Sequence, residues 1–251
     1  MTKKIIRKKS YSSDEDKAWS QLRSLYQKTP IPNEEMLHHL SVYMNRQTIT
    51  RLLLMDYLYN KILDVHGAIM EFGTRWGRDL VVFQSLMGLY EPYNINRRIV
   101  GFDTFEGFVS IEKEDGKHPI AKKGSYNVTE GYERHLNKIM KTNAMFNPVS
   151  HIDRFEIIKG DASKTLEKYL AENPQTIIAF AYFDMDLYEP TKKCLELIKN
   201  HLTKGSVIGF DELSHDRFPG ETIAFNEVMG SINYSLKRTP FSGDESYIVI
   251  E

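Results

Sequence analysis

The chain has 251 residues, of which 41% are hydrophobic and 27% charged, and its formal net charge is −1. This balance fits one large globular domain and argues against nucleic acid as the main partner, because phosphate binding requires clustered basic side chains. No apolar run reaches the length that spans a membrane, and the single cysteine, Cys194, excludes an internal disulfide. A cytoplasmic protein without a membrane partner is therefore expected.

The first 64 residues predict a helical extension. Residues 1–9 are basic and lack the long apolar run of a signal peptide, which indicates a solvated tail. Apolar side chains recur at helical spacing over residues 13–29 and 33–64, and two prolines separate these segments. The second helix offers an apolar face, which is expected either to cover a sheet or to join two copies in a homodimer.

Beyond the extension, short apolar runs alternate with helical stretches. One of these stretches ends near residue 90, and two others cover residues 163–172 and 188–202. Runs that are apolar throughout predict strands covered on both faces, and their alternation with helices indicates parallel βαβ units. Two more runs near the C-terminus form a hairpin or tight return, which adds one antiparallel strand. The predicted strands are AIMEFG (68–73), RIVGFD (98–103), FEIIKGD (155–161), IIAFAYFD (177–184), GSVIGFD (205–211), SLKRTPF (235–241) and SYIVIE (246–251).

A polar segment over residues 106–150 interrupts this alternation. It is rich in Gly and Lys, with one helix predicted near 130–142. Long insertions of this kind in compact domains often cover a binding site, so a lid over one edge of the sheet is expected. The chain is therefore divided into an extension, residues 1–64, and an α/β domain, residues 65–251.

The strands end in residues that suit a nucleoside ligand, and ligands of open α/β sheets bind beyond the carboxyl ends of the strands. Gly73, in MEFGTRWG, allows a tight turn close to a ligand. Asp103 can accept both hydroxyls of a ribose, or it can be a solvated turn residue or a helix cap. Asp161 can hold an adenine amino group, or it can cap the following helix.

Acids also end the fourth and fifth predicted strands. Asp184 follows one strand, and Asp211 and Glu212 follow the other. Neighbouring strands lie about 4.8 Å apart, so these carboxylates would repel each other unless a cation lay between them. Three carboxylates suit Mg²⁺ or a similar hard ion, and the alternative is that the acids accept hydrogen bonds from loop amides.

Five motifs in this order, MEFGTRWG, GFDTFEGF, KGDASKT, YFDMDLYEPT and GSVIGFDEL, resemble the macrocin-type sugar O-methyltransferases. These enzymes use S-adenosylmethionine and Mg²⁺. The resemblance implies the class I methyltransferase fold, a Rossmann-like seven-stranded sheet, mostly parallel with one antiparallel C-terminal strand and helices on both faces. It places around the cofactor Glu71, Phe72, Gly73, Thr74, Gly77, Asp103, Thr104, Phe105, Asp161, Ala162 and Asp184.

The same resemblance assigns the metal to Asp184, Asp211 and Glu212, although the family commonly has Asp where this chain has Glu212. It implies methyl transfer from S-adenosylmethionine to a sugar hydroxyl, with the metal lowering the pKa of that hydroxyl. Asp186 matches the position of the general base, and His215 is an alternative base because histidine titrates near neutral pH.

Three rival functions remain open. A nicotinamide-dependent oxidoreductase would explain the first Gly-rich turn and Asp103, but not the acids of the fourth and fifth strands, and the chain lacks the usual G-x-G-x-x-G. A metal-dependent enzyme of another reaction type, such as a hydroxylase, could use the same sheet. A non-catalytic binding module could retain the cofactor pocket.

Overall fold

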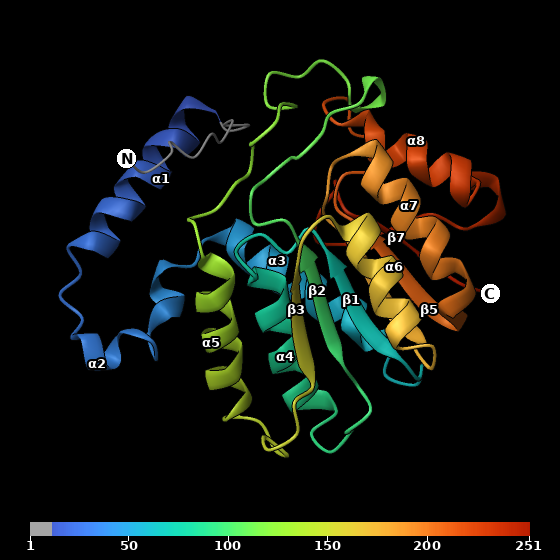
Figure 1. Ribbon diagram of the computed structural model, residues 1–251. Coiled ribbons are helices and arrows are strands. Elements are labelled where there is room, and N and C mark those ends of the chain that lie inside the picture. Colours follow the sequence, from blue (N-terminus) through green and yellow to red (C-terminus); the bar gives the residue numbers. More distant parts are fainter. Residues whose placement is uncertain (1–11) are drawn as a thin grey trace.

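Seven strands form one sheet in the computed structural model, which describes residues 12–251 (Figure 1). The predicted basic tail at residues 1–9 lies outside the described residues. The strands follow each other across the sheet in the order β3-β2-β1-β4-β5-β7-β6. Their bounds are β1 Ala68–Phe72, β2 Ile99–Asp103, β3 Phe155–Lys159, β4 Ile178–Phe183, β5 Leu202–Phe210, β6 Lys237–Arg238 and β7 Ser246–Val249.

Strands β1 to β5 are parallel, and β7 pairs antiparallel with both β5 and β6. Every residue of β1 and β4 is buried, as their continuous apolar runs predict for strands covered on both faces. The expected fold, mostly parallel with one antiparallel C-terminal strand, is confirmed.

A row of four phenylalanines sets the register at the carboxyl edge of the sheet. Phe102, Phe72, Phe183 and Phe210 are paired across neighbouring strands, and their ring centroids lie 5.2, 4.8 and 5.5 Å apart. Stacked rings of this kind add to the burial energy. Because the rings are aligned, the residues that follow them in the sequence all emerge at the same edge.

Helices cover both faces of the sheet. One apolar core joins a face of the sheet to α3, α4 and α5, and a second joins the opposite face to α6, α7 and α8. Cys194 is fully buried in the second core, where it packs among apolar side chains. The helices are α1 Ser13–Gln27, α2 Asn33–Met36, α3 Arg46–Asn60, α4 Arg78–Tyr90, α5 Tyr132–Ala144, α6 Ala162–Glu172, α7 Tyr188–Ile198 and α8 Pro219–Val228, with 3-10 turns at Leu40–Tyr43, Lys113–Asp115, Lys199–His201 and Ser231–Asn233.

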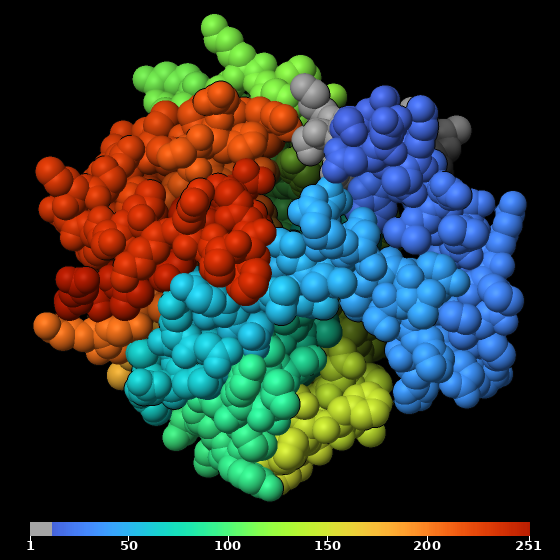
Figure 2. Space-filling model, turned by 180° about the vertical axis from the view of Figure 1, so that it is seen from behind, coloured from blue at the N-terminus to red at the C-terminus, as the bar shows by residue number. Residues whose placement is uncertain are grey.

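The single helix predicted over residues 33–64 is wrong, because the segment divides into α2, a 3-10 turn and α3. The side chain of Asn45 accepts a hydrogen bond from the amide of Thr48 at 2.9 Å and starts a new helix there. Neither α1 nor α2 has a buried residue, whereas α3 buries Leu54, Met55 and Leu58 against the sheet. The segment from α1 to the start of α3, here called the N-terminal arm, is visible beside the body of the molecule in Figure 2.

The insertion contains the predicted helix, α5, and a long loop before it. This loop crosses the end of the molecule near α7 and α8 (Figure 1). Asp115 is buried there and accepts a hydrogen bond from the amide of Tyr188, the first residue of α7, at 2.6 Å. A small apolar core of Phe108, Ile120, Leu187 and Phe218 fixes the loop to the same end. No helix of residues 12–251 is both long and apolar enough to cross a membrane.

Candidate active site

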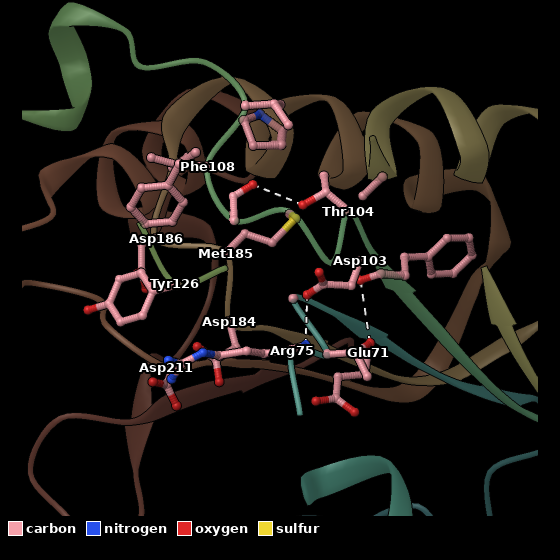
Figure 3. A pocket seen from close by; sticks show the side chains of 18 of the residues that line it. Glu71, Arg75, Asp103, Thr104, Phe108, Tyr126, Asp184, Met185, Asp186 and Asp211 are labelled. Atoms are coloured by element: carbon pink, nitrogen blue, oxygen red, sulfur yellow. Dashed lines mark hydrogen bonds between the residues drawn. The ribbon is translucent and has the colours of Figure 1, made fainter. Parts of the chain in front are cut away.

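A cavity of about 690 Å³ opens at the carboxyl edge of the sheet. Its lining comes from the ends of β1, β2, β3, β4 and β5 and from the loop that follows β2. Figure 3 shows labelled side chains from the ends of β1, β2, β4 and β5 and from the loop after β2 around one space. This volume lies within the range of sites for small ligands and cofactors.

The turn after β1 brings two backbones unusually close. Gly73 has φ +94°, and a Cβ on it would lie 1.9 Å from the carbonyl oxygen of Asp184. Only glycine is compatible with both the left-handed backbone and this contact. The tight turn predicted at Gly73 is therefore confirmed, and it joins the end of β1 to the end of β4.

Asp103, at the end of β2, is held by backbone amides. One carboxylate oxygen accepts from the amide of Arg75 at 2.7 Å, and the other accepts from the amide of Phe105. Burial raises the pKa of Asp103, and these two hydrogen bonds oppose the shift. A carboxylate oxygen has two lone pairs, so each oxygen keeps one acceptor position for a ligand in the cavity.

Asp161 caps a helix and also lines the cavity. Its side chain accepts from the amide of Ser163 at 3.1 Å and from the hydroxyl of the same residue at 2.7 Å, at the start of α6. The helix-cap role is confirmed. Because the residue also lines the cavity, contact with an adenine remains compatible with it.

Glu71 brings a buried carboxylate to the cavity. Its side chain is 2% exposed, and its Oε2 atom has no hydrogen-bond partner among residues 12–251. Burial raises its pKa well above the usual value, and the charges of Asp79 and Asp184 add to the shift. A buried acceptor without a partner is costly, so the site favours a donor or a cation from a ligand at this place.

Four acids from the ends of β4 and β5 line the opposite side of the cavity: Asp184, Asp186, Asp211 and Glu212. Asp186 is 7% exposed and has φ +62°, in the left-handed region. Burial, followed by the charges of Glu212 and Asp184, raises the pKa of Asp186 well above its usual value. Burial and Asp211 raise the pKa of Glu212 to about 7.

Arg51, on α3, reaches two of these acids, Asp184 and Asp211, from the N-terminal extension. Its Nη2 atom lies 2.6 Å from Asp79 Oδ2 and 3.2 Å from Asp184 Oδ2. Its Nη1 atom contacts Asp211 Oδ1 and lies 3.3 Å from Glu245 Oε1. The guanidinium side chain is only 7% exposed. One buried cation therefore joins four carboxylates that come from four different parts of the sequence.

The predicted metal ligands, as they lie here, do not fit an ion. In the part of the chain that the structure describes, no group of three or more His, Cys, Asp or Glu side chains is arranged to hold one. Asp184 and Asp211 both pair with Arg51, and Asp211 also accepts from the hydroxyl of Tyr182 at 2.7 Å. The backbone amide of Glu212 donates to Glu221 Oε2. The Oε2 atom of the Glu212 side chain has no hydrogen-bond partner among residues 12–251.

Most of the predicted site residues line the cavity, but four do not. The ring of Phe72 packs in the core under α6 to α8, and that of Phe105 packs in the core under α3 to α5. Gly77, with φ +74°, starts α4 and faces Leu136. His215 accepts from the amide of Arg217 and does not line the cavity. Asp186 is thus the better placed of the two candidate bases.

Sequence reasoning missed several residues of the site. The sequence does carry a signal for Arg51, because this charged residue lies three, four and seven positions before Leu54, Met55 and Leu58, on the buried stripe of α3. No local pattern singles out the others. Among the missed residues, Arg75, Arg78, Asp79, Phe108, Val109, Tyr126 and Met185 line the cavity, Arg51 contacts Asp184 and Asp211, and Glu245 pairs with Arg51.

Comparisons with known proteins agree with this geometry. A family model described as a methyltransferase domain matches residues 70–213. The crystal structure of CalS11, a calicheamicin methyltransferase, is 43% identical, covers 98% of this chain and 95% of its own, and superposes with a TM-score of 0.93. A second CalS11 structure, described as TDP-rhamnose 3'-O-methyltransferase, is 41% identical, covers 98% and 96%, and has a TM-score of 0.84.

A more distant structure shares the fold. The O-methyltransferase NovP is 17% identical, with 80% of each chain covered and a TM-score of 0.58. A search of curated proteins gives no match. The two CalS11 structures extend over the N-terminal arm as well as the sheet, since they cover nearly the whole chain.

Proposed function

The chain belongs to the methyltransferase family matched over residues 70–213, and from this premise we propose that it methylates a hydroxyl of a nucleotide-linked sugar, with S-adenosylmethionine as methyl donor. The observation that carries the proposal is the 43% identity to CalS11 over 98% of the chain, together with a cavity at the edge where such sheets bind ligands. The acceptor class comes from the description of CalS11 as a TDP-rhamnose methyltransferase.

For the cofactor, we propose the side of the cavity formed by β1, β2 and β3. Asp103 has free acceptor positions for the two ribose hydroxyls, and Asp161 lies beside the place of the adenine. Glu71, whose Oε2 atom has no partner among residues 12–251, suits the amino group of the methionine part. When bound, the cofactor supplies an electrophilic methyl group on a sulfonium.

For the proton of the acceptor hydroxyl, we propose Asp186 as general base. It lines the cavity two residues after Asp184, and its raised pKa makes its carboxylate a stronger base than an exposed aspartate. Phe108 and Tyr126, from the loop over the site, contribute an aromatic wall that limits the access of water. His215 lies outside the cavity lining, so it is not given this role.

The magnesium dependence expected from the sequence stays a prediction. The pairing of Asp184 and Asp211 with Arg51 does not support it, so no step here depends on an ion. Activity measured after dialysis against EDTA, with and without added Mg²⁺, tests this point directly. The expected cytoplasmic location also stays a prediction.

Product analysis tests the reaction. The purified chain is incubated with methyl-labelled S-adenosylmethionine and TDP-rhamnose, and the sugar is analysed by mass spectrometry. A labelled methyl ether is expected, and Asp186→Asn should lower kcat by about 10²–10⁴-fold while leaving the affinity for S-adenosylhomocysteine unchanged. Calorimetry that shows binding of NAD but not of S-adenosylhomocysteine would reject the proposal in favour of an oxidoreductase.

We also propose that two copies form a dimer through the N-terminal arm. Leu37, Val42 and Ile49 are 82%, 64% and 45% exposed, and α1 and α2 bury no residue within one chain. Apolar side chains exposed along one arm favour contact with a second chain. Sedimentation analysis should give twice the chain mass. Replacing Leu37 and Val42 by Ser should reduce it to one chain, and a single-chain mass for the unaltered protein would contradict the proposal.

A further inference from the structure

The acids at the ends of β4 and β5 need a cation, and the structure contains one. Asp184 and Asp211 follow neighbouring paired strands, in register after Phe183 and Phe210. Without a positive charge between them, one of the two would have to take up a proton. The guanidinium of Arg51 lies in contact with both, through Nη2 to Asp184 Oδ2 at 3.2 Å and through Nη1 to Asp211 Oδ1.

The shape of the guanidinium suits this position. Its planar group offers five N–H donors in fixed directions, whereas the ammonium group of lysine is a compact point charge. Arg51 uses Nε and Nη2 on the two oxygens of Asp79, and its two terminal nitrogens then reach Asp184 on one side and Asp211 with Glu245 on the other. The group also lies 5.1 Å from the ring centroid of Tyr182, an aromatic face that attracts cations.

We infer that Arg51 is the resident cation of this site, bound between Asp184 and Asp211 where the sequence predicts a divalent ion. A divalent ion would need the same oxygens that pair with the guanidinium, and two cations that close would repel each other. The third predicted ligand, Glu212, does not complete an ion site with the other two, since no such group exists among residues 12–251. The inference rests on the proposed function only in taking this cavity as the active site.

Arg51 is a positioning residue in this account. It connects the end of β4 with the end of β5 and with the start of α4. The end of β4 carries the backbone that meets Gly73, and it leads to Asp186. Because Arg51 belongs to α3, the extension before the sheet supplies a charge to the site. The 7% exposure of its side chain means that water screens these contacts poorly.

Titration with Mn²⁺, followed by electron paramagnetic resonance, tests the inference on the full chain. The unaltered protein is expected to show no saturable site up to about 1 mM Mn²⁺. Arg51→Met removes the guanidinium from the carboxylates and should create one site. This site should bind Mn²⁺ about tenfold or more tightly than the unaltered protein does. Adding Asp184→Asn to that variant should abolish the new site. Arg78→Met is the matched control, because Arg78 forms its ion pair with Asp79, away from the end of β5, and it should create no site.

One Mn²⁺ bound tightly to the unaltered protein, and lost in Asp184→Asn, would overturn the inference. So would a folded Arg51→Met variant that gains no site. If Arg51→Met fails to fold, Arg51→Lys and the unaltered protein decide: a saturable site in the unaltered protein overturns the inference, and its absence from both supports it. Binding of S-adenosylhomocysteine in EDTA is measured on the same samples. If the unaltered protein does not bind S-adenosylhomocysteine, the proposed function is rejected, whereas the conclusion on Mn²⁺ binding is unchanged.

Discussion

At the scale of single residues, Gly73 is the position where backbone geometry limits the sequence most severely. Its φ of +94° acts together with the 1.9 Å that would separate a Cβ at this position from the carbonyl oxygen of Asp184. Gly124 shares the positive φ, at +83°, but a Cβ there meets nothing within 4 Å. A comparison of substitutions at the two positions therefore distinguishes the cost of backbone strain from the cost of steric contact.

We expect Gly73→Ala to lower the free energy of unfolding by about 2–4 kcal/mol, the sum of strain and overpacking. Gly124→Ala should cost about 1–2 kcal/mol, the strain alone. Urea denaturation of the two variants measures the difference. Equal losses in both would show that the contact with Asp184 relaxes without cost.

The charge state of Asp186 should shape the pH dependence of the reaction. A general base works only when deprotonated, and burial with neighbouring acids raises the pKa of Asp186. We therefore expect kcat/KM to keep rising with pH above the range in which an exposed aspartate titrates. A pH profile of the unaltered chain checks this. The same rise in Asp186→Asn, at a lower rate, would assign the titration to another group such as Glu212.

At the scale of elements, Asp115 connects the loop over the site to the helix that follows β4. One of its oxygens accepts from the amide of Tyr188 at 2.6 Å and the other from the amide of Glu112 at 2.7 Å. The first bond satisfies a free amide at the start of α7, so Asp115 acts as a cap supplied from a distant part of the chain. Burial raises the pKa of Asp115, and the two amide hydrogen bonds oppose this.

Asp115→Ala should release the loop from α7. We expect a loss of about 1 kcal/mol in the free energy of unfolding, as for other helix caps, and faster hydrogen exchange across residues 104–131. Because Phe108 and Tyr126 lie in this loop, the KM for the acceptor should rise more than kcat falls. Glu106→Ala, at an exposed position of the same loop, is the control. Unchanged exchange in Asp115→Ala would show that the apolar contacts alone hold the loop.

At the scale of the whole molecule, the buried acids make the ligand-free fold sensitive to pH. Burial, as the largest cause, raises the pKa values of Glu71, Asp184, Asp186 and Glu221, and it raises that of Glu212 to about 7. Asp79 differs, because Arg51 and Arg78 outweigh its burial and lower its pKa. These five groups, together with Asp103 and Asp115, therefore bind protons more strongly in the folded chain than in the unfolded chain.

Between about pH 4.5 and 7 the folded state holds more protons than the unfolded state at these groups, so stability should fall as pH rises. The lowered pKa of Asp79 acts in the opposite sense, but only at lower pH. We expect the Tm of the ligand-free chain to decrease from about pH 5.5 to about pH 7.5, and Glu212→Gln to flatten the slope. Calorimetry at several pH values measures both. A Tm that increases over this range would contradict the assignment of these acids as buried without a matching number of cations.

The sequence determined the strands, their parallel direction and the acids that end them. Continuous apolar runs mark strands buried on both faces, and Asp103, Asp161, Asp184 and Asp211 are expected at one edge because parallel strands end on the same side. Both kinds of signal are local, so they can be read from neighbouring residues. The single helix expected over residues 33–64 is wrong, since its division depends on a cap at Asn45 rather than on apolar spacing.

Only the tertiary structure decided which charges meet. Arg51 precedes Asp184 by 133 residues and Asp211 by 160, so their contacts depend on how α3 packs on the sheet. The same holds for Asp115 and Tyr188, which are 73 residues apart. Such pairings gain their energy from long-range burial and charge, and no periodicity in the sequence records them. The sequence could therefore place the acids of the site, but the fold decided that an arginine from the extension lies between them.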